Sequence, residues 1–587
     1  MKISSYLWHA FILLYLGNTL HALTYDYSAT TECLEEAWKI PYGGGIIQNP
    51  EFEHGSEGWT VFGHGNIEER TTKSGNRFIT IVNRTQPYDS LAQRVQLQKG
   101  KLYAFSAWIQ ISEGSEVISV IFRSPSGEYL HGGTVIAEQG CWSMLKGGIV
   151  ATFSGPVDLT FETKNTNSEI WVDNVSLQPF TKKQWRSHQE NTISKVRKHK
   201  VKFQVTNQEN TSISGSKIIL KQIKPGFPVG CEINLNILNN TKYQNWFTSR
   251  FSVAAFGNEM KWYFNEQTQG HEDYTIPDAM LKFCEQNNID VRGHNIVWDN
   301  PIYQPTWINR EISPRDLNET AKKRTESIVL RYKGRLIHWD VVNENLHFSF
   351  YEDKLGANAS AEFYARTYKL DQTPILFLNE YNTIEYSKDE MSIPAKYARK
   401  LKNIVAYYRN RSGSNTSLPM GIGLQSRFGP GQPNFAYMRA GMDYLASMGF
   451  PLWLTEVFVD KGDNQEDYLE DVLREGYGHP AVKGIVIWPT SPFSSDCKMC
   501  LTDQNFSNTP NGDVIDKIIK EVWAPKTQEI MADGQGIFDV HLPHGDYEVH
   551  VMHFATNSYT KLKFKVDENS TNFVHVQINT LAPYDCM

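Results

Sequence analysis

Short runs of alternating apolar and polar residues, separated by turn residues, fill the chain from about residue 44 to 180. Examples are residues 77–82, 101–109, 117–122 and 169–177. Closely spaced strands without intervening amphipathic helices are typical of an antiparallel β-sandwich. We therefore expect a β-sandwich over residues 44–180.

Between about residues 226 and 524 the pattern changes, because apolar strand-like runs now alternate with helical periodicity. Eight such runs occur, at 227–233, 251–256, 291–298, 337–344, 374–382, 421–428, 451–459 and 484–488. Alternating strands and helices indicate βα units, whose strands form a parallel sheet. Eight repeats over roughly 300 residues predict a (β/α)₈ barrel.

Two further strand-like segments flank the predicted barrel, at residues 195–223 and 526–580. The first begins with a basic cluster, whose alternation with Val and Phe indicates a strand with a solvated face rather than a polyanion site. Together the two segments resemble a small transthyretin-like sandwich, split by the barrel between them. The expected fold class is therefore multidomain: a β-sandwich, a (β/α)₈ TIM barrel and a split accessory β-sandwich.

The residues at the N-terminus predict in which cellular compartment the protein acts. Lys2 precedes an apolar run at residues 7–16, and Ala22 offers a small residue for cleavage, so residues 1–22 are predicted to be a signal peptide too short to span a bilayer. No later stretch has the apolar length of a transmembrane helix, and no membrane anchor is expected. Ten Asn-x-Ser/Thr sequons fit a secreted, extracellular glycoprotein. They are Asn83, Asn174, Asn210, Asn239, Asn318, Asn358, Asn410, Asn415, Asn505 and Asn569.

The net charge and the aromatic content of the chain exclude some classes of function. The 587 residues include 58 basic and 65 acidic side chains, a net charge of −7, which argues against a nucleic-acid partner. Aromatic residues make up 12% of the chain, too many for a disordered protein. These rings can fill cores, and they can also stack on the flat faces of sugars.

Seven cysteines are few for this length, so the chain is not a disulfide-stapled scaffold. Cys497 and Cys500 form a C-x-x-C pair, but no second pair completes a zinc site. We interpret them as a local disulfide or structural thiols rather than a redox centre. The pairing of the other five cannot be predicted from the sequence.

Polar and aromatic residues collect where the predicted barrel strands end, the face on which barrel enzymes carry their sites. They are Asn258, Lys261, His294, Trp298, Asn343, Glu344, Tyr381, Gln425, Glu456 and Trp488. Glu344 is at the end of the fourth predicted strand, and Glu456 is on the seventh. One carboxyl can protonate a departing sugar oxygen while the other attacks the anomeric carbon, as in retaining glycosidases.

Several of these strand ends resemble the motifs of glycoside hydrolase family 10. The motifs are Asn258-Glu-Met-Lys-Trp262, Gly293-His-Asn-Ile-Val-Trp298, Trp339-Asp-Val-Val-Asn-Glu344, Gly421-Ile-Gly-Leu-Gln425 and Leu454-Thr-Glu456. Cys500-Leu-Thr-Asp503 and Asn511-Gly-Asp-Val514 are similar to the plant branch. The resemblance implies an endo-1,4-β-xylanase of the cell wall or apoplast that cleaves xylan internally with retention and needs no metal or organic cofactor. The oligomeric state stays open.

The resemblance also implies roles for single residues. Glu344 would be the acid/base and Glu456 the nucleophile, and the other eight would line the sugar subsites. Asn343 suits a hydrogen bond to the 2-hydroxyl of the reacting sugar. Glu344 must be protonated near neutral pH, so we expect burial and the charge of Glu456 to raise its pKa.

The N-terminal sandwich resembles xylan-type carbohydrate-binding modules. Its landmarks are Asn49-Pro-Glu-Phe-Glu-His-Gly-Ser-Glu-Gly-Trp59, Ser106-Ala-Trp108, Gly140-Cys-Trp-Ser143 and Trp171-Val-Asp-Asn-Val175. Five rings are candidate sugar platforms, with packing between the sheets as the alternative. These rings are Trp59, Tyr103, Trp108, Tyr129 and Trp142.

Two positions depart from the family pattern beside the nucleophile. Arg427 stands where the family usually has His, and Phe458 where it usually has Asp; Gly257 also replaces a Glu found in many microbial members. A permanently charged Arg beside Glu456 is expected to stabilise its carboxylate and reduce its nucleophilicity. The sequence thus leaves two hypotheses: an active secreted xylanase, of ordinary or reduced rate, or a catalytically impaired xylan-binding wall protein.

Overall fold

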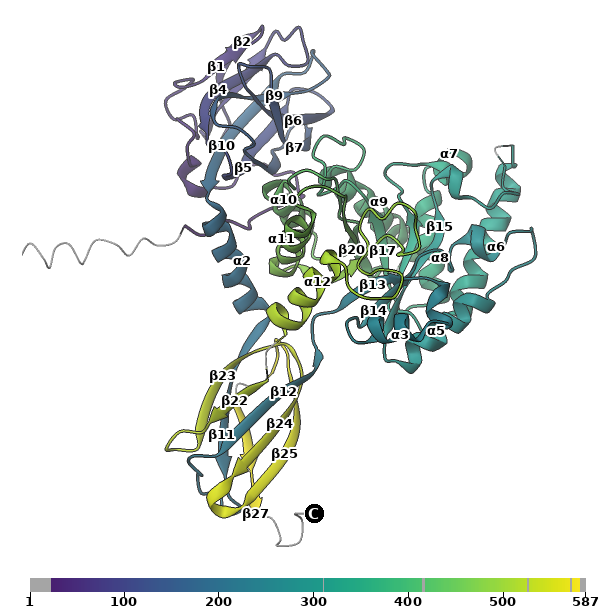
Figure 1. Cartoon of the computed structure of the whole chain (residues 1–587). Helices are drawn as coiled ribbons and strands as arrows, with labels where there is room; N and C mark the ends of the chain where they lie inside the picture. Colours follow the sequence, from purple (N-terminus) through teal and green to yellow (C-terminus); the bar gives the residue numbers. More distant parts are fainter. Residues whose placement is uncertain (1–22, 310, 414–416, 525–526, 571–572, 581–587) are drawn as a thin grey trace, which may run out of the picture.

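The chain folds into three parts, which Figure 1 shows one above another. The computed structural model describes residues 23–309, 311–413, 417–524, 527–570 and 573–580. The predicted signal peptide lies outside these residues. A β-sandwich comes first in the chain, the barrel lies in the middle, and a second, smaller sandwich packs below it.

The N-terminal sandwich consists of two five-stranded antiparallel sheets. The first has the order β1 (Thr60–Phe62), β4 (Ser90–Leu97), β9 (Gly155–Glu162), β6 (Ser115–Arg123) and β7 (Tyr129–Glu138). The second has the order β2 (Asn66–Thr71), β3 (Arg77–Val82), β10 (Ile170–Phe180), β5 (Leu102–Ile111) and β8 (Ser143–Val150). Apolar side chains from both sheets form one core, so the predicted sandwich is confirmed.

Eight parallel strands form the barrel, and pairing of β18 with β20 closes it. The strands are β13 (Val229–Ile233), β14 (Val253–Phe256), β15 (Asp290–Trp298), β16 (His338–Asn343), β17 (Ile375–Glu380), β18 (Met420–Leu424), β20 (Leu452–Val459) and β21 (Val482–Ile487). Each coincides with one of the eight predicted runs, so the barrel prediction is confirmed. Strands β16 and β20 are buried along their whole length, because the core covers one face and helices the other.

Helices connect these strands on the outside of the barrel, as both views show. They are α3 (Thr241–Thr248), α4 (Trp262–Asn265), α5 (Thr275–Gln286), α6 (Pro314–Arg331), α7 (Phe350–Leu355), α8 (Ala359–Leu370), α9 (Pro394–Ser412), α10 (Phe435–Ala446), α11 (Gln465–Gly478) and α12 (Pro510–Asp516). A short strand, β19 (Arg427–Phe428), pairs with the end of β20. It carries Arg427 to the carboxyl end of the barrel.

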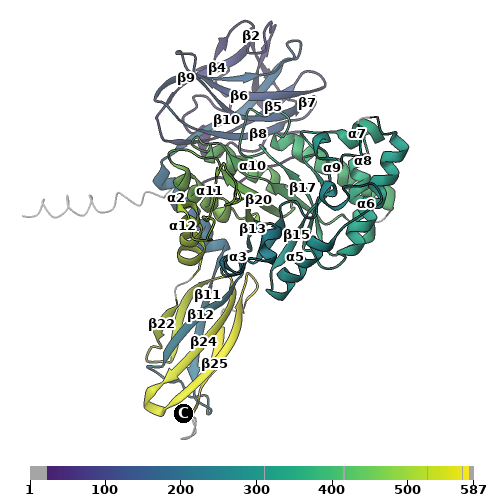
Figure 2. The same cartoon turned by 45° about the vertical axis from the view of Figure 1, so that its right-hand side comes forward.

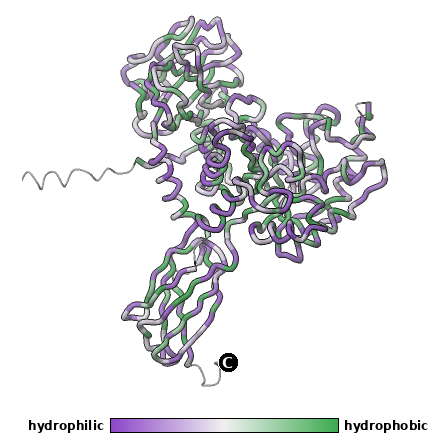
Figure 3. Tube along the Cα trace, in the orientation of Figure 1, coloured by the Kyte–Doolittle hydropathy of each residue, from purple (hydrophilic) through white to green (hydrophobic). Residues whose placement is uncertain are grey.

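The smaller sandwich is built from segments on both sides of the barrel. Strand β11 (Lys198–Thr206) pairs with β23 (Ile537–Pro543) and β26 (Phe573–Gln577). Strand β12 (Lys217–Pro225) pairs with β22 (Gln528–Met531) and β24 (Gly545–His553), and β24 continues to β25 (Ser558–Val566). Apolar and polar residues alternate along these strands in Figure 3. The chain therefore leaves this sandwich, forms the barrel and returns to complete it.

A buried ionic network fixes the N-terminal sandwich on the barrel. Lys146 of β8 lies 2.8 Å from Asp443 of α10, and Asp443 also accepts a hydrogen bond from the hydroxyl of Tyr25 (2.8 Å). His479 contacts the same carboxylate at 2.9 Å. Figure 2 shows β8 directly above α10. Because removing one member of a buried ion pair leaves an unpaired charge, this network favours one fixed position of the sandwich.

Disulfides and sequons complete the fold. The structure has disulfides between Cys33 and Cys141 and between Cys497 and Cys500, which agrees with the local disulfide interpretation of the C-x-x-C pair. Cys231 and Cys284 are buried thiols, and Cys586 lies outside the described residues. In the described part of the chain, no helix is long and apolar enough to cross a membrane.

Eight of the ten sequon asparagines are exposed, and Asn415 lies outside the described residues. Asn174 is the exception: it is buried, and its side-chain nitrogen donates to the carbonyl of Trp38 at 2.8 Å. A glycan attached to this nitrogen has no room in the folded sandwich. The structure therefore corrects the prediction at Asn174.

Candidate active site

Both predicted catalytic glutamates lie at the carboxyl end of the barrel. Glu344 directly follows β16, and its backbone NH donates to the carbonyl of Asn379 at 3.0 Å. Glu456 lies within β20, and its NH donates to the carbonyl of Gln425 at 3.0 Å. Glu344 has a φ of 58°, a conformation that is uncommon for a residue with a side chain and is typical of functional sites.

The environment of Glu344 suits a proton donor. Its carboxyl accepts hydrogen bonds from Trp298 Nε1 (2.8 Å) and Gln425 Nε2 (3.1 Å). Burial raises the pKa of Glu344 to about 7, and the charges of Glu380 and Glu456 act in the same direction, while the two hydrogen bonds oppose the shift. Glu344 is therefore substantially protonated at neutral pH, as the sequence predicted.

Asn379 connects Glu456 to Asn343. Its side-chain nitrogen donates to Glu456 Oε1 and to Asn343 Oδ1, both at 3.0 Å. Thr455 Oγ1 donates to Asn379 Oδ1 and fixes the orientation of the amide. Sequence reasoning did not assign Asn379 to the site, although its position at the end of β17 was the available signal. The contact leaves Asn343 Nδ2 as the amide group that can donate to a sugar hydroxyl.

Lysine, histidine and tryptophan side chains form the adjoining wall. Lys261 Nζ lies 4.6 Å from the ring centre of Trp298 and 5.9 Å from that of Trp488. Burial lowers the pKa of Lys261, while the charges of Glu456 and Glu344 oppose this shift. His294 packs edge-on against Trp488, with 5.1 Å between ring centres.

The buried ion pair between Arg292 and Asp340 orients the ring of His294. Its Nδ1 contacts Asp340 Oδ2 at 2.8 Å, and Arg292 holds the other carboxylate oxygen at 2.7 Å. The contact to Asp340 leaves Nε2 as the ring nitrogen available to a ligand. Pairing offsets the cost of burying both charges, so Arg292 and Asp340 form a fixed base for the histidine.

Tyr381 and Asn258 lie at the edge of this group. Tyr381 stacks on His347 with 3.7 Å between ring centres, and burial and the nearby Glu344 charge raise the pKa of its hydroxyl. Asn258 is exposed, and its Oδ1 accepts a hydrogen bond from the Tyr263 hydroxyl at 2.6 Å. The structure thus joins eight of the ten predicted residues in one connected group, with Tyr381 beside it and Asn258 at the rim.

Arg427 and Phe458, the two residues that depart from the family pattern beside the nucleophile, are in contact with each other. Arg427 pairs in register with Phe458, and its guanidinium lies 4.9 Å from the Phe458 ring centre. Its Nη1 lies 3.4 Å from Glu456 Oε2. Asp460 instead accepts a hydrogen bond from the backbone NH of Lys461. Arg427 therefore contacts the predicted nucleophile directly, and Phe458 packs against Arg427.

Glu232, which sequence reasoning missed, fills the space above Gly257. A Cβ at Gly257 would lie 2.2 Å from Glu232 Oε1, so the glycine leaves room for this carboxyl. Burial raises the pKa of Glu232 to about 8, the Glu259 charge adds to the shift, and Lys261 opposes it. The signal in the sequence was an acidic residue near the end of the first barrel strand.

The sandwich rings that were candidate sugar platforms are mostly core residues. Trp59, Tyr103, Trp108 and Trp142 are each at most 5% exposed, so they have no free face for a sugar, and the packing alternative is correct for them. Tyr129 is 48% exposed at the start of β7. Of the five candidates it alone presents a solvent-accessible ring.

A closed barrel of eight parallel strands with a buried glutamate pair at its carboxyl end defines the class of (β/α)₈ glycoside hydrolases. The model of glycosyl hydrolase family 10 matches residues 219–564, and that of a carbohydrate binding domain matches residues 44–169. The chain therefore belongs to glycosyl hydrolase family 10 and is a hydrolase with an N-terminal carbohydrate-binding module.

Three relatives from Arabidopsis thaliana align over nearly the whole chain. "Endo-1,4-beta-xylanase 5-like" is 43% identical and covers 94% of this chain and 93% of its own length. "Endo-1,4-beta-xylanase 5" is 42% identical over 94% of both chains. "Endo-1,4-beta-xylanase 4" is 39% identical over 97% of this chain and 96% of its own. The similarity thus includes both sandwiches as well as the barrel.

The raised pKa of Glu344 predicts the alkaline limb of the pH profile. A general acid works in its protonated form, so kcat/KM on a xylo-oligosaccharide should fall as pH rises through about 7. The Trp298 hydrogen bond favours the charged carboxylate, so Trp298→Phe should move this limb to higher pH. A pH series of initial rates measures both effects; an unchanged limb in the Trp298 variant would contradict this account of the pKa.

Proposed function

We propose that this protein is a secreted endo-1,4-β-xylanase that hydrolyses internal bonds of xylan with retention. The observation that carries the proposal is the different environment of the two glutamates. Burial raises the pKa of Glu344 to about 7, whereas Glu456 contacts the side-chain nitrogen of Asn379 and the guanidinium of Arg427. Two carboxyls with different environments suit an acid and a nucleophile. The names of the three relatives support xylan as the substrate.

In the first step, Glu344 gives its proton to the departing glycosidic oxygen while a carboxylate oxygen of Glu456 attacks the anomeric carbon. The carbon–oxygen bond breaks and a glycosyl ester of Glu456 forms. In the second step, Glu344 removes a proton from water, and the water oxygen displaces Glu456. Two displacements at one carbon return the original configuration. Asn343 Nδ2 would hold the 2-hydroxyl, a contact that strengthens in the transition state.

The N-terminal module is proposed to hold xylan while the barrel cleaves it. The buried network around Asp443 fixes the module on α10, so a chain bound to the module stays at a constant distance from the barrel. Secretion to the cell wall is proposed from the apolar N-terminal run and from the eight exposed sequon asparagines.

A second candidate function is a xylan-binding wall protein with little turnover. The observation that favours it is the contact of Arg427 with Glu456, because a fixed positive charge stabilises the carboxylate before it attacks. The Arg427 side chain is 37% exposed, so solvent screens part of this effect. We therefore place the active enzyme first.

A reducing-end assay on xylan separates the two functions. The full chain is compared with Glu456→Gln, which keeps the shape of the site and lacks the nucleophile. Turnover well above that of the variant is the expected result. Equal rates, together with retained binding to insoluble xylan, would establish the binding protein instead.

A further inference from the structure

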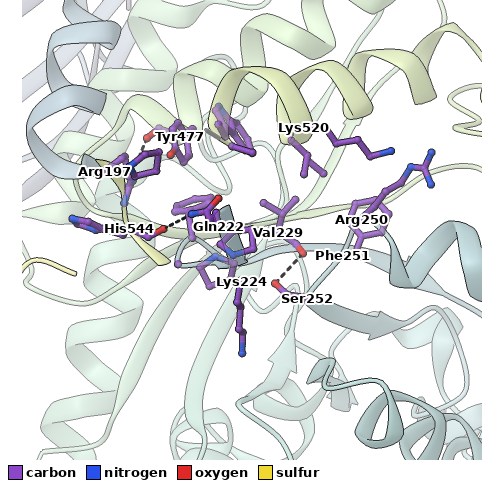
Figure 4. Close-up of a pocket in the computed structure, with 18 of the residues that line it drawn as sticks. Arg197, Gln222, Lys224, Val229, Arg250, Phe251, Ser252, Tyr477, Lys520 and His544 are labelled. Carbon is purple, nitrogen blue, oxygen red and sulfur yellow. Dashed lines mark hydrogen bonds between the residues drawn. The ribbon is translucent and has the colours of Figure 1, made fainter. Parts of the chain in front are cut away.

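A cavity of about 820 Å³ lies where the barrel meets the smaller sandwich. It is at the amino ends of the barrel strands, opposite the end that carries Glu344 and Glu456. Its wall includes residues before β13, the end of helix α2 (Lys182–Val196), and the π-helical segment Lys517–Trp523. Figure 4 shows labelled side chains from both the sandwich and the barrel around it, with Arg197 on one side, Arg250 and Lys520 on the other, and Lys224 extending downward away from both. The proposed function leaves this cavity without a role.

Among the charged residues of the cavity wall, basic side chains outnumber acidic ones, although the whole chain has a net charge of −7. The cations are Arg197, Lys224, Arg250, Lys483 and Lys520, and the acidic lining residue is Glu568. Arg250 and Lys520 share one carboxylate, that of Asp516, at 2.7 and 3.0 Å. Lys224 and Lys483 have no ion pair within the part of the chain that the structure describes. A net positive charge therefore remains to attract an anion.

Arg197 places a buried positive charge at this cavity. It is 7% exposed, and its guanidinium donates to the carbonyls of Tyr477, His479 and Val482 at 2.7–2.9 Å. Burial lowers its pKa to about 10, so it stays charged at neutral pH. No carboxylate of the described residues forms an ion pair with it. A buried cation that is hydrogen-bonded to backbone carbonyls but has no counter-charge gains stability when an anion binds nearby.

Trp523 adds an aromatic ring to the cavity wall. The residue lines the cavity, is 8% exposed and stacks on Tyr477 with 4.2 Å between ring centres. Its Nε1 is buried and has no acceptor among the described residues. Because this nitrogen is itself inaccessible, Trp523 borders the cavity with other atoms of its ring system and not with its NH.

We propose that this cavity binds an acidic oligosaccharide through its uronate carboxylates. Several separate cations around a space of this size suit a ligand with spaced carboxylates better than one compact anion. Charge-assisted hydrogen bonds from Lys and Arg to carboxylates are among the stronger polar contacts. The inference goes beyond the proposed function and does not depend on xylan turnover, because the site is at the other end of the barrel.

Calorimetry on the full chain tests the proposal with a ligand that lacks xylosidic bonds. The probes are a trigalacturonide, its fully methyl-esterified form and inorganic phosphate, each at low salt. The acid should bind at least about tenfold more tightly than the ester, because esterification removes the charges and keeps the rings. Raising the salt concentration should weaken the binding of the acid.

Charge-neutralising variants locate the site. The double variant Lys224→Gln/Lys483→Gln should weaken trigalacturonide binding by about fivefold or more, as expected for two lost cation–carboxylate contacts. Lys202→Gln/Lys563→Gln makes the same charge change at exposed positions of the smaller sandwich outside the cavity, and should leave binding unchanged.

Three results would overturn the proposal. They are equal binding of acid and ester, equal losses in the two lysine double variants, and binding of phosphate without binding of the trigalacturonide. Xylan hydrolysis, measured on the same samples, should be unchanged in both double variants. Failure of the uronate site with intact turnover, or the reverse, therefore separates this inference from the proposed function.

Discussion

Replacing Glu456 with alanine is expected to lower kcat on xylan by on the order of 10³-fold or more, because the proposed mechanism needs this carboxylate to form the glycosyl ester. Sodium azide should restore turnover of an aryl β-xylobioside, since the small anion fits where the carboxylate was. Attack from that face inverts the anomeric carbon, so the product should be the α-glycosyl azide. NMR of the product measures its configuration.

Glu344→Ala is the matched control for this experiment. A dinitrophenyl leaving group needs no proton, so this variant should still form the glycosyl ester with Glu456 and then stall. Azide should attack that ester from the opposite face and give the β-glycosyl azide. The same α product from both variants, or full activity of the Glu456 variant without azide, would contradict the two assigned roles.

The barrel could be predicted from the sequence because its strands are buried on both faces over most of their length. Strand β16, for example, has no exposed position from His338 to Asn343, so it reads as a compact run between helical patterns. The site followed from the same topology. Parallel strands bring their carboxyl ends to one face, and polar residues at those ends therefore had to meet.

The sugar platforms of the module could not be predicted in this way. Nine of the ten positions in β5 are buried, with only Ala104 partly exposed, because the other sheet covers one face while α10 and neighbouring segments approach the other. Along such a strand, polar and apolar positions do not alternate, so the sequence pattern does not distinguish an aromatic ring in the core from one that could bind a sugar. Tyr103 and Trp108 were for this reason indistinguishable from Tyr129 before the structure was known.

Contacts between segments that are far apart in the sequence could not be predicted either. The Tyr25 hydroxyl bonds to Asp443 across a separation of 418 residues, and no local pattern indicates such a pair. Helix α2, in contrast, had a readable signal. Thr181 and Gln184 form a capping box at its start, a Thr-x-x-Gln pattern that marks a helix N-terminus.

Replacing Arg427 with His and Phe458 with Asp together is expected to raise kcat on xylan by about tenfold, or roughly 1.4 kcal/mol of activation free energy. The guanidinium, 3.4 Å from Glu456, stabilises the full charge of the carboxylate, and this charge is lost as the ester forms. A neutral imidazole oriented by an aspartate would support the carboxylate with a hydrogen bond and a smaller electrostatic cost.

Single variants separate the charge of Arg427 from its shape. Arg427→Lys keeps the charge and should leave kcat nearly unchanged, whereas Arg427→Met removes it and should recover part of the gain. Phe458→Asp alone gives Arg427 a second carboxylate and should draw it away from Glu456. An unchanged or lower kcat in the Arg427→His/Phe458→Asp variant, with an unaltered melting temperature, would refute this account. If the parent protein is nearly inactive and the double variant is faster, the loss of turnover lies at these two residues, because the proposed catalytic glutamates are the same in both proteins.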